Sequence, residues 1–348
     1  MRAVFITEFG GPEKIQAGQI PEPAPEFGQA LIRVKAAALN HLDISVRKGR
    51  PGLTLKGAHV MGSDAAGIIE SLGPGCEQLA LKPGDEVVLN PGVGCMACEA
   101  CLRGQQSECA RFRLTGFQNQ GVYAEFAVVP AVNLFPKPAQ LTWEEAAALP
   151  LAHVTAWHML FERAKLLPCD TVLIHGIGGG VACAGLQLCQ LCGATAIVTS
   201  SSDAKLARAK AMGAQAGINY RSTPDVAAAV KAITGGRGVD LVMDSVGAPT
   251  LPISMAAMRR GGRTVTCGIT GGADAQLNMQ QLYWNHLSLI GSTMGSMEDM
   301  RRLVRAAAEK PIRPVIDKVF PLEQYADAVK RMEAAEQFGK IVLNVSCP

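Results

Sequence analysis

The stretch that decides the fold spans residues 171–202 and reads TVLIHGIGGGVACAGLQLCQLCGATAIVTSSS. It begins with a short apolar and β-branched run at 171–174, passes through a glycine-rich turn and enters a segment with apolar residues at helical spacing. A second β-branched run follows at 196–199. A strand, a glycine turn, a helix and a strand within about thirty residues make one βαβ unit.

The glycine turn of this unit predicts a dinucleotide-binding site. Glycines leave backbone N–H groups free to approach a phosphate, and the N-terminus of the following helix adds positive potential. The residues that we expect at the phosphates are Gly176, Gly178, Gly179, Gly180 and Val181.

Composition narrows the class of protein. A chain of 348 residues is longer than one hydrophobic core usually serves, so we expect two domains. The content of 48% hydrophobic and 18% charged residues is typical of a globular protein. A net charge of +3 without a basic stripe argues against nucleic acid or an anionic membrane surface as a partner. Without a signal-peptide pattern or a spanning apolar stretch, we expect a cytoplasmic protein.

The 11 cysteines fall into two groups. An odd number, with several inside apolar helix and strand patterns, argues against a disulfide framework and fits a reducing compartment. The other group, Cys95, Cys98, Cys101 and Cys109, has the spacing C-x2-C-x2-C-x7-C, which predicts one structural Zn²⁺ held by four thiolates. The alternatives are four unrelated cysteines, two disulfides or an iron–sulfur cluster.

The pattern along the chain changes twice. Residues 1–90 contain short strand-like runs punctuated by Pro and Gly, which favours a small barrel or sandwich. Strand and helix patterns alternate from about residue 139 to 290, which is the signature of a doubly wound parallel sheet. Thr142 and Glu145 predict a capping box at the start of a helix, and we place the first boundary just before it, after residue 138.

Four motifs together resemble the medium-chain dehydrogenase/reductase superfamily. They are LNHLD at 39–43, MGSDAAG at 61–67, the cysteine lobe and the glycine turn. The resemblance covers the whole chain and implies an α/β protein with a GroES-like β-barrel substrate domain and a Rossmann domain. With the boundaries that the pattern gives, we assign residues 1–138 to the barrel, with the zinc lobe at 91–115. We assign residues 139–296 to the NAD(P)-binding Rossmann domain, and residues 297–348 to a return to the barrel.

The chain departs from the zinc alcohol dehydrogenases of that superfamily at the catalytic metal. The resemblance places Asn40 and Ser63 where those enzymes have a Cys and a His ligand, and the third ligand falls near Leu151. A regrouped metal site from His41, His59, His153 and Asp64 is the alternative. The combination ALN-x-x-D with GSD-x-AG is similar instead to the quinone oxidoreductase branch, which works without metal.

The expected reaction follows from this departure. Oxidation of a simple alcohol needs an alkoxide, and without a catalytic zinc there is no Lewis acid to stabilise it. Hydride addition to a quinone or an α,β-unsaturated carbonyl needs less assistance, because the negative charge is delocalised onto oxygen. We therefore expect an NADPH-dependent reductase of small electrophiles. A zinc-dependent alcohol dehydrogenase and a non-catalytic NADPH sensor are the alternatives.

The resemblance also implies positions for the other site residues. It places Asn40 and Thr155 beside the nicotinamide, His41 near the pyrophosphate, and Asp64 in the local hydrogen-bond network; we take Asn40 and Asp64 as the candidate catalytic residues. Further cofactor contacts are expected where strands end, at Val246, Gly268, Ile269 and Ser292.

The end of the second strand favours NADP(H) over NAD(H). NAD requires an acidic residue there, but the chain has Ser200 and Ser201, with Asp203 expected as a helix N-cap. These hydroxyls and Lys205 suit a 2′-phosphate, which needs donors and positive charge. The resemblance also places Tyr220 near the adenosine phosphate of NADPH. The edge strand at 288–291 further predicts a homodimer, with a tetramer as the alternative.

Overall fold

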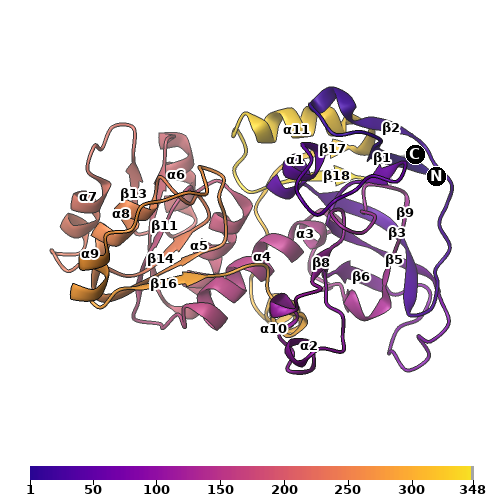
Figure 1. Ribbon diagram of the computed structural model, residues 1–348, viewed down its shortest axis with the longest axis horizontal. Coiled ribbons are helices and arrows are strands. Elements are labelled where there is room, and N and C mark those ends of the chain that lie inside the picture. Colours follow the sequence, from indigo (N-terminus) through magenta and orange to yellow (C-terminus); the bar gives the residue numbers. More distant parts are fainter. Residues whose placement is uncertain (346–348) are drawn as a thin grey trace. The chain divides into compact units, whose positions relative to one another are not determined.

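The computed structural model describes residues 1–345. The chain divides into two compact units (Figure 1): a first unit of Met1–Val154 and Gly295–Pro348, and a second unit of Thr155–Met294. None of the helices within the described residues combines the length and the apolar content that crossing a membrane requires.

The second unit is a parallel sheet of six strands with helices on both faces. The strand order is β13-β12-β11-β14-β15-β16, and every neighbouring pair is parallel. This is the Rossmann order 3-2-1-4-5-6, so the predicted doubly wound sheet is confirmed. Figure 1 shows α5 and α6 on one side of the sheet and α7 and α8 on the other. The strands are β11 (Thr171–Ile174), β12 (Thr195–Ser200), β13 (Ala216–Asn219), β14 (Val239–Asp244), β15 (Met258–Thr266) and β16 (Ser288–Gly291). The helices are α5 (Gly180–Cys192), α6 (Asp203–Ala211), α7 (Val226–Ile233), α8 (Leu251–Ala257) and α9 (Met279–Trp284), preceded by a π-helical turn at His158–Arg163.

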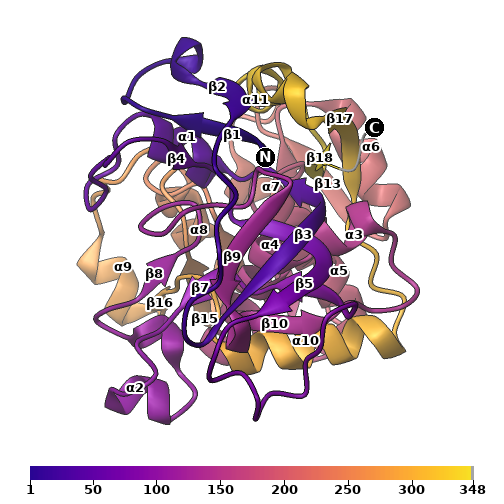
Figure 2. The same ribbon diagram turned by 90° about the vertical axis from the view of Figure 1, so that its right-hand side faces the viewer.

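The first unit is built on a seven-stranded sheet. Its main path is β10-β6-β5-β3-β18-β17, and β9 also pairs with β3. Figure 2 shows β9, β3 and β5 lying side by side. The strands are β3 (Gln29–Ala38), β5 (Asp64–Leu72), β6 (Glu86–Leu89), β9 (Phe126–Pro130), β10 (Leu134–Pro136), β17 (Ile316–Pro321) and β18 (Lys340–Asn344). A second sheet contains β1 (Arg2–Ile6), β2 (Gln16–Gln19) and β4 (His59–Val60), and β7 (Gly92–Val93) pairs with β8 (Arg113–Leu114).

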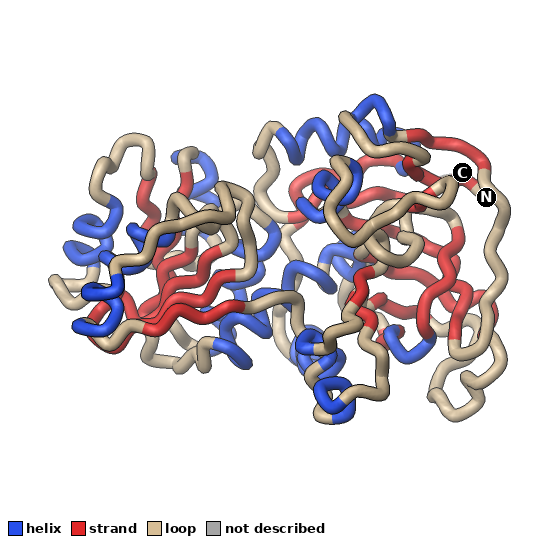
Figure 3. Tube along the Cα trace, viewed as in Figure 1, coloured by secondary structure: helices blue, strands red, loops and turns tan. Residues whose placement is uncertain are grey.

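Most helices of the first unit are short, with four to nine residues, and one is longer, with 13; Figure 3 shows the helices in blue. They are α1 (His41–Arg47), α2 (Glu99–Leu102), α3 (Trp143–Ala148), α4 (Pro150–Trp157, which runs across the division between the units), α10 (Met297–Glu309) and α11 (Tyr325–Glu333). Single 3₁₀ turns occupy Pro12–Lys14, Gln106–Glu108, Ala131–Asn133 and Leu322–Gln324. The predicted capping box is present, because Thr142 accepts from the Glu145 N–H and the Glu145 side chain accepts from the Thr142 N–H.

Two local expectations differ from the structure. The first unit extends to Val154, beyond the predicted boundary after residue 138. The reason is that α3 packs its buried residues 146–148 against β3 and β5. The sequence of residues 121–129, GVYAEFAVV, favours a strand over the whole segment, but only the part from Phe126 onward belongs to β9.

Candidate functional site

The glycine turn connects β11 to α5 in the second unit. Gly176 has φ of +68° and Gly178 of +115°, values that residues with a Cβ rarely adopt. Gly179 is the N-cap of α5, a helix of 13 residues, and carries no side chain to occupy its first N–H groups. The first N–H groups of α5 and the positive end of its dipole therefore face the turn, which suits a pyrophosphate.

Buried side chains brace this turn from below. The Thr199 Oγ1 atom accepts from the Gly176 N–H at 3.3 Å and lies 3.2 Å from His175 Nδ1. The other ring nitrogen of His175 lies 3.2 Å from Ser254 Oγ on α8. A Cβ at Gly185 of α5 would lie 2.4 Å from the sulfur of Met243, so the helix approaches β14 as closely as glycine allows. The sequence prediction included none of these supporting contacts.

The predicted cofactor residues at the strand ends lie at the carboxyl edge of the same sheet. The Val246 N–H donates to Asp244 at 2.7 Å, directly after β14. The Ser292 N–H donates to Thr266 at 2.8 Å, at the end of β15 and β16. Gly268 follows β15 so closely that a Cβ would lie 2.3 Å from a backbone oxygen, and Ile269 beside it is 67% exposed. Ligands of open α/β sheets bind along this edge.

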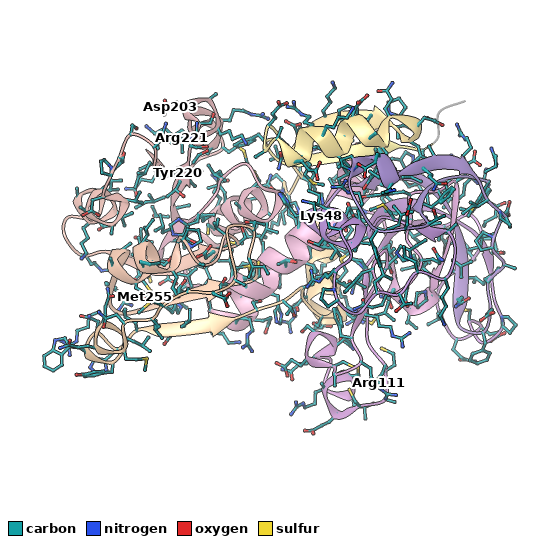
Figure 4. All side chains as sticks on the ribbon, turned by 45° about the horizontal axis from the view of Figure 1, so that its top comes forward. Lys48, Arg111, Asp203, Tyr220, Arg221 and Met255 are labelled. Atoms are coloured by element: carbon teal, nitrogen blue, oxygen red, sulfur yellow. The ribbon has the colours of Figure 1, made fainter. Side chains whose placement is uncertain are left out.

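The end of β12 carries hydroxyls and cations. Ser202, not Asp203, is the N-cap of α6, because the Ser202 side chain accepts from the Lys205 N–H. The expectation for Asp203 is therefore wrong by one residue, and its carboxylate instead accepts from the Asn219 side chain at 2.8 Å. Figure 4 shows Asp203, Tyr220 and Arg221 gathered at this end of the second unit. Exposed Arg221 is a cation that the sequence prediction missed, although it directly follows the predicted Tyr220.

The two candidate catalytic residues meet in the interior of the first unit. The Asn40 Nδ2 atom donates to Asp64 Oδ2 at 2.9 Å, and both side chains are buried. The second Asp64 oxygen accepts from the Leu151 N–H at 2.8 Å and so caps the start of α4. Lys340 joins them from β18: its ammonium donates to Asn40 Oδ1 at 2.6 Å and to Asp64 Oδ2 at 2.9 Å. Lys340 was not predicted, because its sequence context does not distinguish it from an exposed lysine.

The same interior holds a second carboxylate, Asp43. It accepts from the Asn40 N–H at 2.8 Å and from the Tyr123 hydroxyl at 2.6 Å. Burial raises the pKa of Asp43 to about 6, although the hydrogen bonds from Tyr123 and Asn40 act in the opposite direction. Tyr123 is fully buried, and its hydroxyl contributes a polar contact to this network.

This raised pKa predicts how stability depends on pH. An unfolded Asp titrates near 3.9, so the folded state takes up a proton between about pH 4 and 6, and the contribution of Asp43 to stability falls as the pH rises through that window. Relative to Asp43→Asn, the free energy of unfolding of the wild type should fall by about 2 kcal/mol between pH 4 and 7. Denaturant unfolding of both proteins across this range measures it. Parallel curves would show that Asp43 is ionised throughout.

The residues that replace the metal ligands have other partners. The Ser63 hydroxyl is fully buried and donates to the Thr115 carbonyl at 2.7 Å. His59 Nε2 lies 3.3 Å from the Gly116 carbonyl, and His41 is exposed at the start of α1. The side chain of Leu151 has no atom that could bind a metal, and its backbone N–H donates to Asp64. Within residues 1–345, no grouping of three or more His, Cys, Asp or Glu side chains has metal-binding geometry except the four cysteines.

The cysteine lobe fits a tetrahedral zinc. The Sγ atoms of Cys95, Cys98, Cys101 and Cys109 all lie within 4.8 Å of one another, and those of Cys95 and Cys101 are 3.9 Å apart. Four sulfurs about 2.3 Å from a Zn²⁺ would be separated by roughly 3.8 Å. A hydrogen bond from the Ala97 N–H is the main cause that lowers the pKa of Cys95 to about 6, which favours the thiolate. Four thiolates would leave no coordination position open, so a zinc here would be structural.

The lobe is also tied to the rest of the first unit. The Met297 N–H at the start of α10 donates to the Gln106 side chain at 3.3 Å. A Cβ at Gly94 would lie 2.9 Å from Cys101 Sγ, so the chain passes the sulfur cluster at the closest approach that glycine permits. The lobe thus combines a preformed thiol cluster with a fixed attachment.

Known proteins resemble this chain over its whole length. Residues 26–139 match the model of the alcohol dehydrogenase GroES-like domain, which confirms the predicted barrel class, and residues 180–309 match that of the zinc-binding dehydrogenases. A zinc-type alcohol dehydrogenase-like protein of Schizosaccharomyces pombe is 35% identical, with 99% of each chain covered.

Solved structures agree with this. The crystal structure of an NAD-dependent alcohol dehydrogenase is 42% identical with a TM-score of 0.94, covering 99% of this chain and 100% of that one. A crotonyl-CoA carboxylase/reductase in complex with NADP is 26% identical with a TM-score of 0.91, covering 99% and 94%. With two family models matched in order and a dinucleotide turn at the head of a Rossmann sheet, the chain belongs to the medium-chain dehydrogenase/reductase superfamily as an NAD(P)H-dependent oxidoreductase.

Proposed function

We propose that this oxidoreductase transfers hydride from NADPH to a quinone or an α,β-unsaturated carbonyl compound without a catalytic metal, and keeps one structural zinc in its cysteine lobe. The observation that carries the proposal is the set of residues at the catalytic metal position. Asn40, Ser63 and Leu151 provide no thiolate and no imidazole, and the hydroxyl of Ser63 is already bonded to a backbone carbonyl. Zinc in catalytic sites takes three ligands from Cys, His and carboxylates, so this set does not fit it.

The regrouped metal site is supported no better. His59 faces a backbone carbonyl, and both oxygens of Asp64 are bonded to protein donors. A metal would have to displace these contacts and collect ligands that do not converge within the described residues. A conjugated acceptor needs no such Lewis acid, because the charge that develops on hydride addition spreads onto its oxygen.

The protein's contribution to this reaction is positioning. The dinucleotide that the glycine turn and the strand ends would hold supplies the hydride. Asn40, with its amide bonded at both ends, would contact the nicotinamide ribose, and Thr155, which is also buried, would lie beside the ring. Holding donor and acceptor in contact accounts for a large part of the rate in such reactions.

The preference for NADPH is supported by the end of β12. The carboxylate of Asp203, the acidic residue closest to the strand end, is engaged by Asn219, while Ser201, Lys205 and Arg221 supply the donors that a 2′-phosphate requires.

Replacing Lys205 with Ala should raise the KM for NADPH by about 10- to 100-fold, because a charge-assisted hydrogen bond to phosphate contributes about 1.5–3 kcal/mol. The KM for NADH should not change, since NADH lacks that phosphate. Lys210→Ala, an exposed lysine on the same helix α6, is the matched control. Initial rates with both nucleotides measure the effect. A wild type that prefers NADH, or an equal rise for both nucleotides, would contradict the assignment.

A homodimer through the edge of the Rossmann sheet is part of the proposal. β16 is the last strand of its sheet, and Leu289 on it is 42% exposed. Tyr283 and Trp284 on α9, the helix before β16, are more than 60% exposed. The unpaired backbone groups of the β16 edge and these apolar side chains therefore belong to consecutive segments, and a second copy of the chain could cover both. Light scattering after size-exclusion chromatography should give twice the chain mass for the wild type and the monomer mass for Leu289→Asp. A monomeric wild type would contradict the dimer.

The function itself is tested by following NADPH oxidation with a panel of quinones, 2-alkenals, enones and saturated aldehydes, and NADP⁺ reduction with alcohols. We expect turnover with the conjugated acceptors and little with saturated aldehydes or alcohols. Activity confined to alcohols would favour an alcohol dehydrogenase. Tight NADPH binding with no turnover across the panel would favour a sensor.

A further inference from the structure

The ammonium of Lys340 lies at the centre of the hydrogen-bond network that joins Asn40 and Asp64. Its side chain is 4% exposed, and its three donors have three acceptors: the Leu39 carbonyl at 2.7 Å, Asn40 Oδ1 at 2.6 Å and Asp64 Oδ2 at 2.9 Å. Because an ammonium has only three N–H groups, none remains for a substrate. Lys340 therefore cannot act as a proton donor without breaking this arrangement, and its role must be exerted through its partners.

The local chain geometry holds Lys340 in place. Gly339 has φ of +101°, and a Cβ there would lie 2.2 Å from the Val315 carbonyl oxygen. The Lys340 N–H donates to that same oxygen at 2.8 Å. The tight approach between this turn and the segment before β17 fixes where the lysine side chain enters the interior.

Lys340, Asn40 and Asp64 form a closed ring of hydrogen bonds. Lys340 bonds to the amide oxygen of Asn40, the amide nitrogen of Asn40 bonds to Asp64, and Asp64 bonds back to Lys340. If the amide turned over, its NH₂ group would face the ammonium and its oxygen would face the carboxylate, which are two repulsive contacts. The ring thus permits one orientation of the Asn40 amide. The Lys340 ammonium at the amide oxygen and the Asp64 carboxylate at the amide nitrogen also polarise the Asn40 amide in the direction of its resonance.

We propose that Lys340 is a positioning residue that fixes the Asn40 amide for the nicotinamide end of the cofactor. Its ammonium performs at this centre the cross-linking that a divalent cation would perform: it joins the ends of β3, β5 and β18, and through Asp64 it is connected to the start of α4. The inference rests on the proposed function, because it requires a reduced nicotinamide nucleotide beside Asn40.

The test must separate orientation of Asn40 from simple charge balance. Lys340→Met alone would leave Asp64 buried without its partner and could prevent folding. The double variant Lys340→Met with Asp64→Asn removes both charges, retains an acceptor for the Leu151 N–H and leaves the Asn40 amide free to turn over. Lys330→Met, an exposed lysine on α11, is the matched control.

Thermal midpoint, the dissociation constant of NADPH and the fluorescence of the bound nicotinamide are measured for each protein, together with kcat on an accepted electrophile. We expect the double variant to melt close to the wild type, bind NADPH at least tenfold more weakly, show altered nicotinamide emission and lose about 100-fold in kcat. If the double variant instead matched the wild type in NADPH binding, nicotinamide emission, kcat and melting temperature, the proposal would be overturned. Lys340 would then only balance the charge of Asp64.

A second comparison asks whether Lys340 acts through Asn40. In an Asn40→Ala background, adding the two substitutions should weaken NADPH binding no further, since contacting groups that act as a unit are not additive. If the losses in NADPH affinity were additive instead, Lys340 would not act through Asn40. The binding and fluorescence readouts need no turnover, so a wild type that reduces no electrophile would refute the proposed function and still leave the role of Lys340 decided.

Discussion

Cys101→Ser is expected to abolish binding of the proposed structural zinc and to produce the largest loss of stability of any single substitution outside the hydrophobic cores. The side chain is 5% exposed and its sulfur lies 3.9 Å from that of Cys95. The lobe has little regular structure to hold it otherwise, because α2 has four residues and β7 and β8 have two each. Structural zinc supplies roughly 10–16 kcal/mol of binding free energy in isolated zinc-finger peptides, and even a fraction of that exceeds most point substitutions.

Metal analysis and thermal unfolding of the purified protein measure this effect. The matched control is Cys169→Ser, which replaces an exposed thiol in the second unit and should leave both the zinc content and the melting temperature unchanged. If Cys101→Ser retained a full equivalent of zinc and the wild-type melting temperature, the four-thiolate site would be wrong.

Asp64→Ala is expected to give the second large effect. Asp64 is fully buried, and its removal takes away the anion bonded to the Lys340 ammonium and the acceptor of the Leu151 N–H. It also breaks the hydrogen bond that the Asn40 amide donates to this carboxylate. Breaking a buried ion pair by deleting one partner costs about 3–5 kcal/mol, because the remaining charge is uncompensated. Hydride transfer should fall with it, since the orientation of Asn40 depends on the same carboxylate.

Chemical denaturation of Asp64→Ala and Asp327→Ala provides the comparison. Asp327 pairs with Lys330 at 3.3 Å on the surface, where both side chains are more than 60% exposed, and its loss should cost less than about 1 kcal/mol. Equal, small losses in the two variants would mean that the interior of the first unit is hydrated enough to solvate Lys340.

The parts of the fold that were predictable are those set by local pattern. The βαβ unit at 171–202 combines strand, turn and helix signals within a short range, and β11, α5 and β12 lie where it predicts them. The cysteine lobe was equally local, with four ligands inside fifteen residues. β13 (Ala216–Asn219) was not predicted, because its four residues AGIN have a weak strand pattern and depend on pairing with β12.

The parts that were not predictable depend on contacts between distant segments. Lys340 and Asp64 are separated by 276 positions, and a lysine at the start of a short terminal strand is indistinguishable in sequence from an exposed one. The boundary between the first and second units depends on where α3 packs, and the helical pattern of its sequence does not reveal this. Asn40 and Asp64 could be selected because they replace residues of a recognisable motif, but their shared hydrogen bond required the structure.

The central claim is hydride transfer without a catalytic metal in a chain that holds one structural zinc. The most direct measurement is the zinc content per chain combined with the rate of NADPH oxidation by a quinone or enone, before and after mild chelation. The account predicts one zinc per chain that resists chelation while the protein remains folded, and an unchanged rate. Two zinc ions per chain, with activity that disappears when the more labile one is removed, would contradict it.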